Sequence, residues 1–235
     1  MVNGMPALPF DAASALARAQ LFRDLPLPML RELAVVTRPS SFRRGEIIVR
    51  QGDPGEGLFL IVSGEVKVLV QAPSGEQAVV AILGAGDCVG EFSVIDGEPR
   101  SATVEAIDDV DALELLRRDT LLWLRAHPEA MERVMVALVG RLRRTDALVA
   151  DLARLDTRGR LAKTLIDLAH DHGRVEGPGM EIELPITQGD LAAMVGATRE
   201  RVNRILGGLE REGAIQRRGR HIIVLDSDRL RQRIA

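Results

Sequence analysis

Between residues 38 and about 110 the chain repeats one pattern, a short run of β-branched and other apolar residues followed by a glycine-containing turn. The runs cover residues 47–49, 58–62, 66–70, 78–83 and 101–107. Many short strands at regular spacing predict a sandwich, roll or barrel, because a parallel sheet would need helices between its strands. Since 46% of the residues are hydrophobic but only 3% aromatic, the core is expected to be aliphatic.

Helical patterns flank this β-rich stretch. Residues 11 to about 36 predict a helical prelude broken at Pro26 and Pro28, and residues 111–125 are read as a short connecting segment. Pro128 then begins a long helix predicted to run to Leu155, because proline is favoured at the first helical position. Its apolar residues recur in steps of three and four, as in a coiled-coil seam, at Met131, Val134, Leu138, Leu142, Val149 and Leu152.

That seam needs a partner. A second copy of the same helix, related by a two-fold axis, is the simplest one, and it predicts a homodimer. Packing against the chain's own β-rich part is the alternative, and it accounts for only part of the face. Residues 156–160 are read as a hinge, 161–170 as a helix and 173–179 as a solvated loop.

The stretch from Val89 to Glu105 combines groups that suit a nucleotide. Arg100 offers a planar fork of donors for a phosphate, and the Ser101 hydroxyl and nearby main-chain N–H groups can complete an anion nest. Glu91, directly after Gly90, can accept hydrogen bonds from sugar hydroxyls. A surface Glu–Arg pair across a hairpin is the plainer alternative.

The order Gly-Glu, short loop, Pro-Arg-Ser-Ala-Thr resembles the phosphate-binding cassette of the cyclic-AMP receptor protein (CRP/FNR) family. The resemblance implies that Glu91 takes the ribose 2′-hydroxyl and that Arg100 and Ser101 take the cyclic phosphate of cyclic AMP. It also implies that the neighbouring residues Gly90, Phe92, Ser93 and Ala102 complete this pocket. The phrases from Arg44 to Asp53 and from Leu58 to Val66 are similar to the family's β-roll.

The resemblance extends to the long helix. Thr145 matches a family residue that reaches the adenine amino group, Arg141 fits the position that braces the ribose-binding glutamate, and Asp146 stands where the family has serine. A carboxylate can still accept from an exocyclic amine, so adenine is compatible, while selectivity between cyclic AMP and cyclic GMP is left open. Nucleotide binding between the roll and the seam would then favour one arrangement of the helix pair, an allosteric shift.

The C-terminal part carries a helix-turn-helix pattern. Thr187 caps a helix with an acid three residues on, Gly196 makes the turn, and Thr198 caps the second helix. Val202, Ile205, Leu206 and Leu209 form its buried stripe, and residues 213–215 and 221–225 suggest a wing. The residues expected to contact DNA are Thr187, Gln188, Thr198, Arg199, Glu200, Asn203, Arg204, Arg218 and Arg220.

The second helix resembles the family's recognition helix, with Arg199, Glu200 and Arg204 at its base-reading positions, which implies a TGTGA-like half-site. Arginine pairs with guanine and glutamate accepts from cytosine, while Arg218 and Arg220 are expected to hold phosphates. Although the net charge is −3, residues 187–225 carry seven arginines against four acids. A basic end on an acidic body favours a localised contact with double-stranded DNA, and the family implies RNA polymerase as a further partner.

The expected fold class is α+β. The domains are a double-stranded β-roll with N-terminal helices (1–126), a long dimerisation helix (127–155) and a winged helix-turn-helix domain (156–235). A cupin-like metalloenzyme is the rival reading of the roll, but all four histidines lie outside residues 38–110 and no metal site is expected. We therefore expect a transcription regulator and not an enzyme.

The remaining alternatives concern the effector and the compartment. A regulator on the same scaffold that needs no nucleotide, or that senses haem or redox, stays open, although the intact Glu91, Arg100 and Ser101 set argues against a vestigial pocket. The single cysteine excludes a disulfide framework, and no apolar run approaches membrane-spanning length or follows a basic N-terminal segment. The expectation is a cytoplasmic protein without a membrane partner.

Overall fold

The computed structural model describes residues 11–72, 75, 77–182, 187–219 and 221–234, and in helix α5 the side chains of Arg141, Arg144 and Leu148 are outside the described part. The chain divides into two compact units. The first comprises Met1–Gln71 and Ala81–Leu142, and the second comprises Ala72–Val80 and Arg143–Ala235. None of the described helices is both long enough and apolar enough to cross a lipid bilayer.

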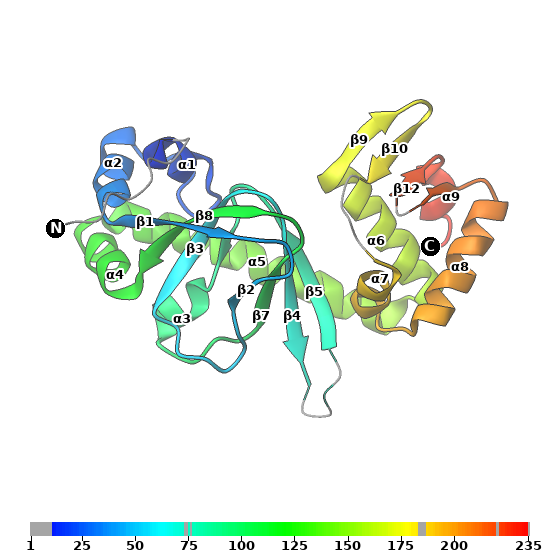
Figure 1. Ribbon diagram of the computed structural model, residues 1–235, viewed down its shortest axis with the longest axis horizontal. Helices are drawn as coiled ribbons and strands as arrows, with labels where there is room; N and C mark the ends of the chain where they lie inside the picture. Colours follow the sequence, from blue (N-terminus) through cyan, green and yellow to red (C-terminus); the bar gives the residue numbers. More distant parts are fainter. Residues whose placement is uncertain (1–10, 73–74, 76, 183–186, 220, 235) are drawn as a thin grey trace. The chain divides into compact units, whose positions relative to one another are not determined.

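The first unit contains most of the predicted β-roll, which is built from two four-stranded sheets with orders β1-β8-β3-β6 and β2-β7-β4-β5 (Figure 1). Their strands are β1 (Thr37–Phe42), β2 (Ile47–Val49), β3 (Gly57–Ser63), β4 (Val66–Gln71), β5 (Gln77–Leu83), β6 (Cys88–Val89), β7 (Thr103–Ala106) and β8 (Val110–Leu116). An aliphatic cluster fills the space between the sheets, including Val49, Ile61, Val68, Val104 and Ala112. The five predicted runs are all strands.

Residues 111–125 are not the connecting segment that the sequence suggested. They form β8, which lies between β1 and β3, and helix α4 (Arg117–Ala126). Leu113 and Leu115 of β8 are fully buried, and Trp123 and Leu124 of α4 are buried as well. Burial against the roll therefore decides the structure of this segment. The expected short loop between Glu91 and Arg100 likewise contains one helix, α3 (Glu91–Asp96).

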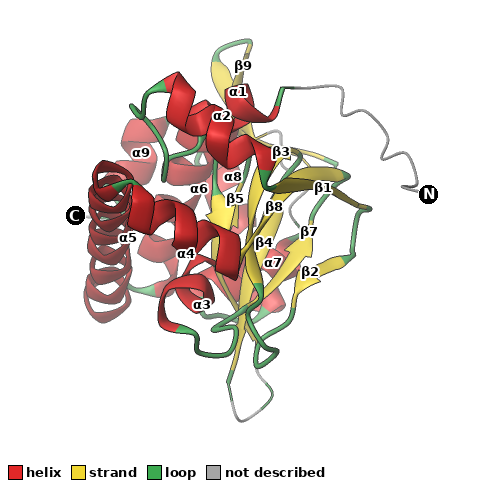
Figure 2. Ribbon diagram, turned by 90° about the vertical axis from the view of Figure 1, so that its left-hand side faces the viewer, coloured by secondary structure: helices red, strands yellow, loops and turns green. Residues whose placement is uncertain are grey.

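Helices α1 (Ala12–Arg18), α2 (Leu27–Val35), α4 and the beginning of α5 cover one sheet (Figures 1 and 2). Leu16, Phe22 and Leu33 pack with Leu60 and Trp123 in a second core cluster. The predicted break at Pro26 is confirmed, because α2 starts directly after it, whereas Pro28 lies in the first turn of α2 and does not break the helix. These contacts fix α4 on the roll, beside α3.

Helix α5 runs from Pro128 to Arg154 over 27 residues, close to its predicted bounds. Of the predicted seam, Val134 is buried and Leu138 half-buried against the roll's own core, as the alternative packing on the roll required for part of the face. The other four seam residues, Met131, Leu142, Val149 and Leu152, are exposed, and so are the neighbouring apolar residues Met135, Val136 and Val139. The helix thus has two apolar faces near its start, one for the roll and one exposed.

The second unit carries the predicted winged helix-turn-helix. Its elements are α6 (Thr157–His172), β9 (Gly173–Glu176), β10 (Gly179–Ile182), α7 (Gln188–Val195), α8 (Arg199–Arg211), β11 (Ile215–Arg218), β12 (His221–Val224) and α9 (Ser227–Arg231). The four strands form one sheet in the order β11-β12-β10-β9.

Two expectations for this unit are corrected. Residues 157–160 are the first turn of α6, not a hinge, because the Asp156 carboxylate accepts a hydrogen bond from the Gly159 N–H at 2.7 Å and caps the helix. Residues 173–176 are strand β9 rather than loop, since they pair in antiparallel register with β10.

Candidate functional site

The first candidate site is a cradle where β6 leads into α3 and where the chain enters β7. Seven predicted residues from two segments line one cavity there. They are Gly90, Glu91, Phe92, Ser93, Arg100, Ser101 and Ala102. The fold therefore brings together the carboxylate, the guanidinium and the hydroxyl that the sequence singled out.

Gly90 sets the geometry of this cradle. It adopts a left-handed conformation, with φ at 84°, just before α3, which costs little for glycine and much for other residues. Its carbonyl accepts a hydrogen bond from Nη1 of Arg100 at 3.0 Å. A Cβ built on Gly90 would overlap that same nitrogen. Glycine is thus required both by the turn and by the close approach of Arg100.

Arg100 is 7% exposed and Glu91 4% exposed, so both charged side chains are buried within the roll. Burial lowers the pKa of Arg100, and the negative charges of Glu91, Glu114 and Glu56 oppose that shift. Arginine stays protonated under such conditions, so the cradle holds a buried, directional cation. A buried fork of this kind is suited to an anion with adjacent hydroxyl groups.

The main chain of Arg100 is clasped by the β2–β3 loop. The Gly52 N–H donates to the Arg100 carbonyl at 2.9 Å, and the Arg100 N–H donates to the Asp53 carbonyl at 2.9 Å. These two bonds hold the backbone of Arg100 at one place, so its side chain starts from a fixed anchor.

The sequence interpretation missed the apolar side of the cradle, formed by Val49, Val68, Val89 and Val104. Strand alternation could have found them, because successive side chains of a strand point to opposite faces. The cradle is not the cavity with the greater volume on the roll. The cradle encloses about 30 Å³, whereas a groove elsewhere on the roll encloses about 890 Å³ but has only partly or fully exposed charged residues.

The three ligand-binding residues predicted on α5 are not among the described residues that line this cradle. Thr145 and Asp146 are exposed on the part of the helix that belongs to the second unit. Arg141 lies in α5, but its side chain is outside the described part of the structure. Contact of these three residues with a ligand stays a prediction.

The second candidate site is the α7–α8 pair. The predicted capping box is confirmed, because the Thr187 hydroxyl accepts from the Asp190 N–H at 3.1 Å and the Asp190 carboxylate accepts from the Thr187 N–H at 3.0 Å. Gly196 ends α7 in a left-handed conformation, and the Thr198 hydroxyl accepts from the Arg201 N–H to cap α8. These local bonds fix the turn between the helices.

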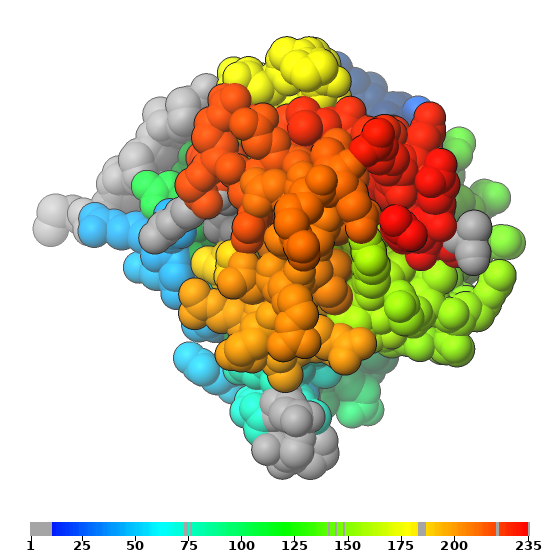
Figure 3. Space-filling model, turned by 90° about the vertical axis from the view of Figure 1, so that its right-hand side faces the viewer, coloured from blue at the N-terminus to red at the C-terminus, as the bar shows by residue number. Residues whose placement is uncertain are grey.

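Helix α8 buries one face and exposes the other. Val202, Leu206 and Leu209 are fully buried, while the predicted Ile205 is half-buried. Its first turns expose Arg199, Glu200, Asn203 and Arg204, whose helix lies on the face of the second unit seen in Figure 3. Hydrogen bonding to its own main-chain N–H and to Thr198 lowers the pKa of Glu200, so this carboxylate is an ionised acceptor at neutral pH.

A residue that the sequence interpretation left out connects the wing to α8. Arg217 of β11 donates to the Asn203 side-chain oxygen at 2.9 Å and to the Glu210 carboxylate at 2.9 Å. The same Asn203 oxygen lies 3.4 Å from the side-chain nitrogen of Gln188. The Asn203 oxygen is thereby occupied within the protein, which leaves its amide N–H groups for an outside acceptor.

The predicted phosphate contacts of the wing are only partly described. Arg218 is exposed and forms an ion pair with Glu176 of β9 at 3.2 Å. Arg220 lies outside the described residues. An exposed ion pair is weak, so Arg218 can exchange this partner for a phosphate at little cost.

Comparisons with known proteins agree with both halves of this arrangement. A family model for the cyclic nucleotide-binding domain matches residues 39–127, and one for the Crp-like helix-turn-helix domain matches residues 159–233.

Similar proteins include a CRP-like cAMP-activated global transcriptional regulator of Mycobacterium tuberculosis, 36% identical over 218 residues, which cover 93% of this chain and 97% of that protein. The cAMP-activated global transcriptional regulator CRP of Escherichia coli O157:H7 is 34% identical over 179 residues, 75% of this chain and 84% of its own length. Among solved structures, the c-di-GMP-responsive global regulator CLP of Xanthomonas campestris superposes with a TM-score of 0.76 at 22% identity, covering 85% of this chain and 99% of that one. This last likeness concerns the fold.

Proposed function

We propose a specific function from the premise that this chain belongs to the CRP/FNR family of DNA-binding transcription regulators, which are not enzymes, and carries a cyclic nucleotide-binding domain. Within that family we propose that the protein is a cyclic-AMP-responsive regulator that acts as a homodimer on a pseudo-palindromic operator. The observation that carries the effector assignment is the buried guanidinium of Arg100, held at the Gly90 carbonyl in the same cavity as Glu91.

The groups that line this cavity match the chemical groups of cyclic AMP. Arg100 and Ser101 supply donors for the cyclic phosphate, Glu91 accepts from the ribose 2′-hydroxyl, and the valines offer an apolar wall to the sugar and base. The names of the relatives from Mycobacterium and Escherichia support cyclic AMP as the effector. Thr145 and Asp146 are proposed to meet the base, with Asp146 accepting from the adenine amino group.

The effector assignment is tested by calorimetry with cyclic AMP and cyclic GMP on the full-length protein. We expect saturable binding of cyclic AMP, which is lost in Arg100→Leu and weakened in Arg100→Lys, because lysine keeps the charge without the fork. Binding should be unchanged in the control Arg38→Leu, at an exposed position of β1. Far-ultraviolet circular dichroism checks that each variant folds. If the wild-type protein bound neither nucleotide, the alternative of a same-fold regulator without a nucleotide effector, or with a different one, would hold.

The homodimer is supported by the exposed apolar side chains of α5. Leu142 is 60% exposed and Val149 61% exposed in the single chain, and an extended apolar stripe on a helix marks a surface for a partner helix. Sedimentation velocity tests this. Leu142→Glu is expected to give monomers that bind a two-half-site operator poorly, whereas a wild-type monomer at assay concentration would contradict the proposal.

The operator is proposed to contain TGTGA-like half-sites read by Arg199, Glu200 and Arg204, spaced by about one helical turn, ~34–36 Å. Glu200→Ala should cost about 1–3 kcal/mol and relax the preference at one base pair. Gel-shift titration over single-base operator variants measures this. A loss of equal size on all sequences would mean that Glu200 does not read a base.

Two further assignments rest on the resemblance to the family. RNA polymerase is the proposed protein partner, with the 173–179 region as the candidate contact, and its exposed Val175 lies in the β9–β10 hairpin. The cytoplasm is the proposed compartment, because that is where a bacterial regulator meets its operator. Co-sedimentation of the operator complex with RNA polymerase tests the first, and cell fractionation tests the second.

A further inference from the structure

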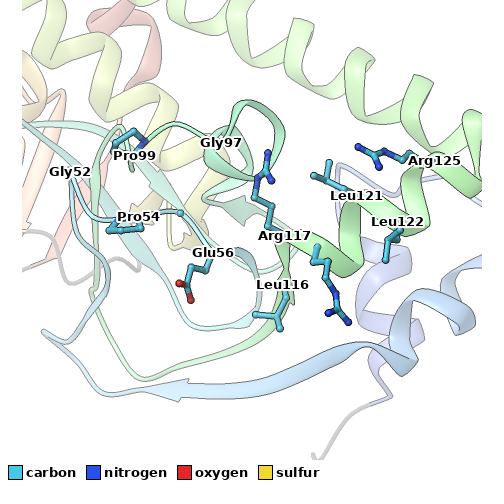
Figure 4. Close-up of a pocket in the computed structure, with 12 residues that line it drawn as sticks. Gly52, Pro54, Glu56, Gly97, Pro99, Leu116, Arg117, Leu121, Leu122 and Arg125 are labelled. Carbon is cyan, nitrogen blue, oxygen red and sulfur yellow. The ribbon is translucent and has the colours of Figure 1, made fainter.

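A groove on the first unit lies outside the effector cradle. It encloses about 890 Å³ between the β2–β3 loop, the turn after α3 and one face of α4 (Figure 4). We call it the α4 groove, and its lining includes Pro54, Glu56, Pro99, Leu116 and five residues of α4. A hollow of this size is in the range of pockets that bind ligands or peptide segments.

The α4 face that lines the groove has a regular arrangement of charge and apolar surface. Arg117, Leu121 and Arg125 follow one another at intervals of four residues, so they share one side of the helix. In Figure 4 the two arginines flank Leu121. At a rise of 1.5 Å per residue, the Cα atoms of Arg117 and Arg125 are about 12 Å apart along the helix axis. Leu122, on the next ridge, is 56% exposed although it lines the same groove.

The charge of the groove is not balanced by its own residues. Three arginines line it, and Glu56 is the acidic residue among the described lining. Arg118 is 3.3 Å from its neighbour Asp119, and Arg117 uses Nε to donate to the Ser93 carbonyl at 3.3 Å. Arg125 is exposed and has no ion-pair partner within the described part of the chain. Arg117 and Arg125 therefore have donors available for an acidic ligand.

The walls of the groove are held by main-chain bonds. The Arg117 N–H donates to the Glu56 carbonyl at 2.7 Å, which joins α4 to the β2–β3 loop. The Gly52 N–H, which donates to the Arg100 carbonyl, and the Asp53 carbonyl, which accepts from the Arg100 N–H, hold the other end of that loop. A surface that is already formed binds without the cost of ordering it.

We propose that the α4 groove docks an acidic, leucine-bearing segment of a protein partner, with two carboxylates about 12 Å apart on either side of an apolar side chain. A small anion would engage one guanidinium and leave the leucines exposed to water. Nucleic acid fits less well, because Glu56 repels phosphates and Leu121 and Leu122 have no counterpart on a phosphate backbone. An acidic amphipathic helix matches both features, since carboxylates two turns apart align with the two arginines.

This proposal goes beyond the effector and operator assignments and depends on neither. The probe is a fluorescein-labelled peptide of about 15 residues with two glutamates eight positions apart and leucines between them. Fluorescence anisotropy with the full-length protein should give saturable binding. A matched peptide with glutamine at both positions should bind roughly tenfold more weakly, because each lost charge-assisted bond removes part of the affinity.

The protein variants separate the groove from general attraction to a charged surface. Arg125→Glu and Leu122→Asp, both at exposed positions, should each weaken the glutamate peptide roughly tenfold or more, whereas Arg31→Glu on α2 should leave it unchanged. Changing one peptide glutamate to lysine should restore binding to Arg125→Glu. Unchanged circular dichroism spectra confirm that these variants fold.

Three results would overturn the proposal. The first is equal affinity of the glutamate and glutamine peptides for the wild-type protein. The second is that duplex DNA displaces the peptide and that Arg125→Glu weakens DNA binding as much as peptide binding, which would make the groove a phosphate site. The third is a change of self-association caused by Arg125→Glu, which would assign the groove to a second copy of this chain.

Discussion

Replacing Gly90 with alanine is expected to damage the effector cradle by more than its backbone strain accounts for. A left-handed conformation costs an L-residue about 1–2 kcal/mol. Alanine also makes the unfolded chain stiffer, which offsets about 0.4–1 kcal/mol of that cost. Backbone strain alone therefore predicts a loss of stability of about 1 kcal/mol. The new Cβ would also overlap Nη1 of Arg100.

The guanidinium can move away, but only by giving up its bond to the Gly90 carbonyl. A hydrogen bond from a charged group contributes about 1.5–3 kcal/mol, so the total loss should be roughly 2–4 kcal/mol. Because Arg100 no longer points at the phosphate position, cyclic AMP affinity should fall at least about tenfold, the equivalent of 1.4 kcal/mol.

Gly45 supplies the matched control. It has φ of +82° in the same unit, but a Cβ there would meet nothing within 4 Å. Gly45→Ala should thus lose about 1 kcal/mol and bind nucleotide normally. Urea unfolding of the full-length proteins can be followed by Trp123, the single tryptophan, which lies in the core of the first unit. Equal losses of stability and of nucleotide affinity in the two variants would refute the reasoning.

Three further predictions concern the second unit. Hydrogen bonding to Arg158 holds the pKa of Glu212 below its usual 4.5. The ionised carboxylate therefore stabilises the fold above pH 4.5, and this stabilisation is lost as the pH falls through the lower pKa of the folded state. The stability advantage of the wild type over Glu212→Gln, measured by urea unfolding at several pH values, should shrink on acidification, and a constant advantage would contradict this. Leu206 is fully buried, so Leu206→Ala should lose about 2–5 kcal/mol, measured by thermal unfolding, and a loss below 1 kcal/mol would mean that the helix is not anchored there. Arg217→Met should weaken operator binding by loosening β11 from Asn203, which gel shifts with unchanged secondary structure would detect, and full affinity would show that this connection is dispensable.

The sequence predicts a segment's secondary structure when its local propensity favours the same state as its packing in the fold. The runs at 47–49 and 66–70 are β-branched and bounded by turns, so local propensity and burial favour the same state. Strand β8 contains Ala112, Leu113, Glu114 and Leu115, which are helix formers. Its place between β1 and β3 overrides that propensity, which no local pattern reveals.

The candidate site follows the same rule. Residues from Gly90 to Ala102 are close in sequence, and their types carry the chemistry, so their gathering could be predicted. The contact between Arg217 and Asn203 spans 14 residues and depends on how β11 packs on α8. The sequence left open which apolar positions of α5 pack on the roll, as Val134 does, because an apolar position on this helix fits either of its two faces.

The hydrogen bonds from Arg217 to α8 affect the entropy that the protein loses when it binds DNA. A wing that ordered itself only on contact would lose conformational freedom at that moment and weaken the complex accordingly. Here the strand and the helix are already joined through Asn203 and Glu210, so that entropy is lost during folding instead. Strand and helix should then approach the duplex as one body, and a lengthened wing would alter operator choice only by breaking this junction.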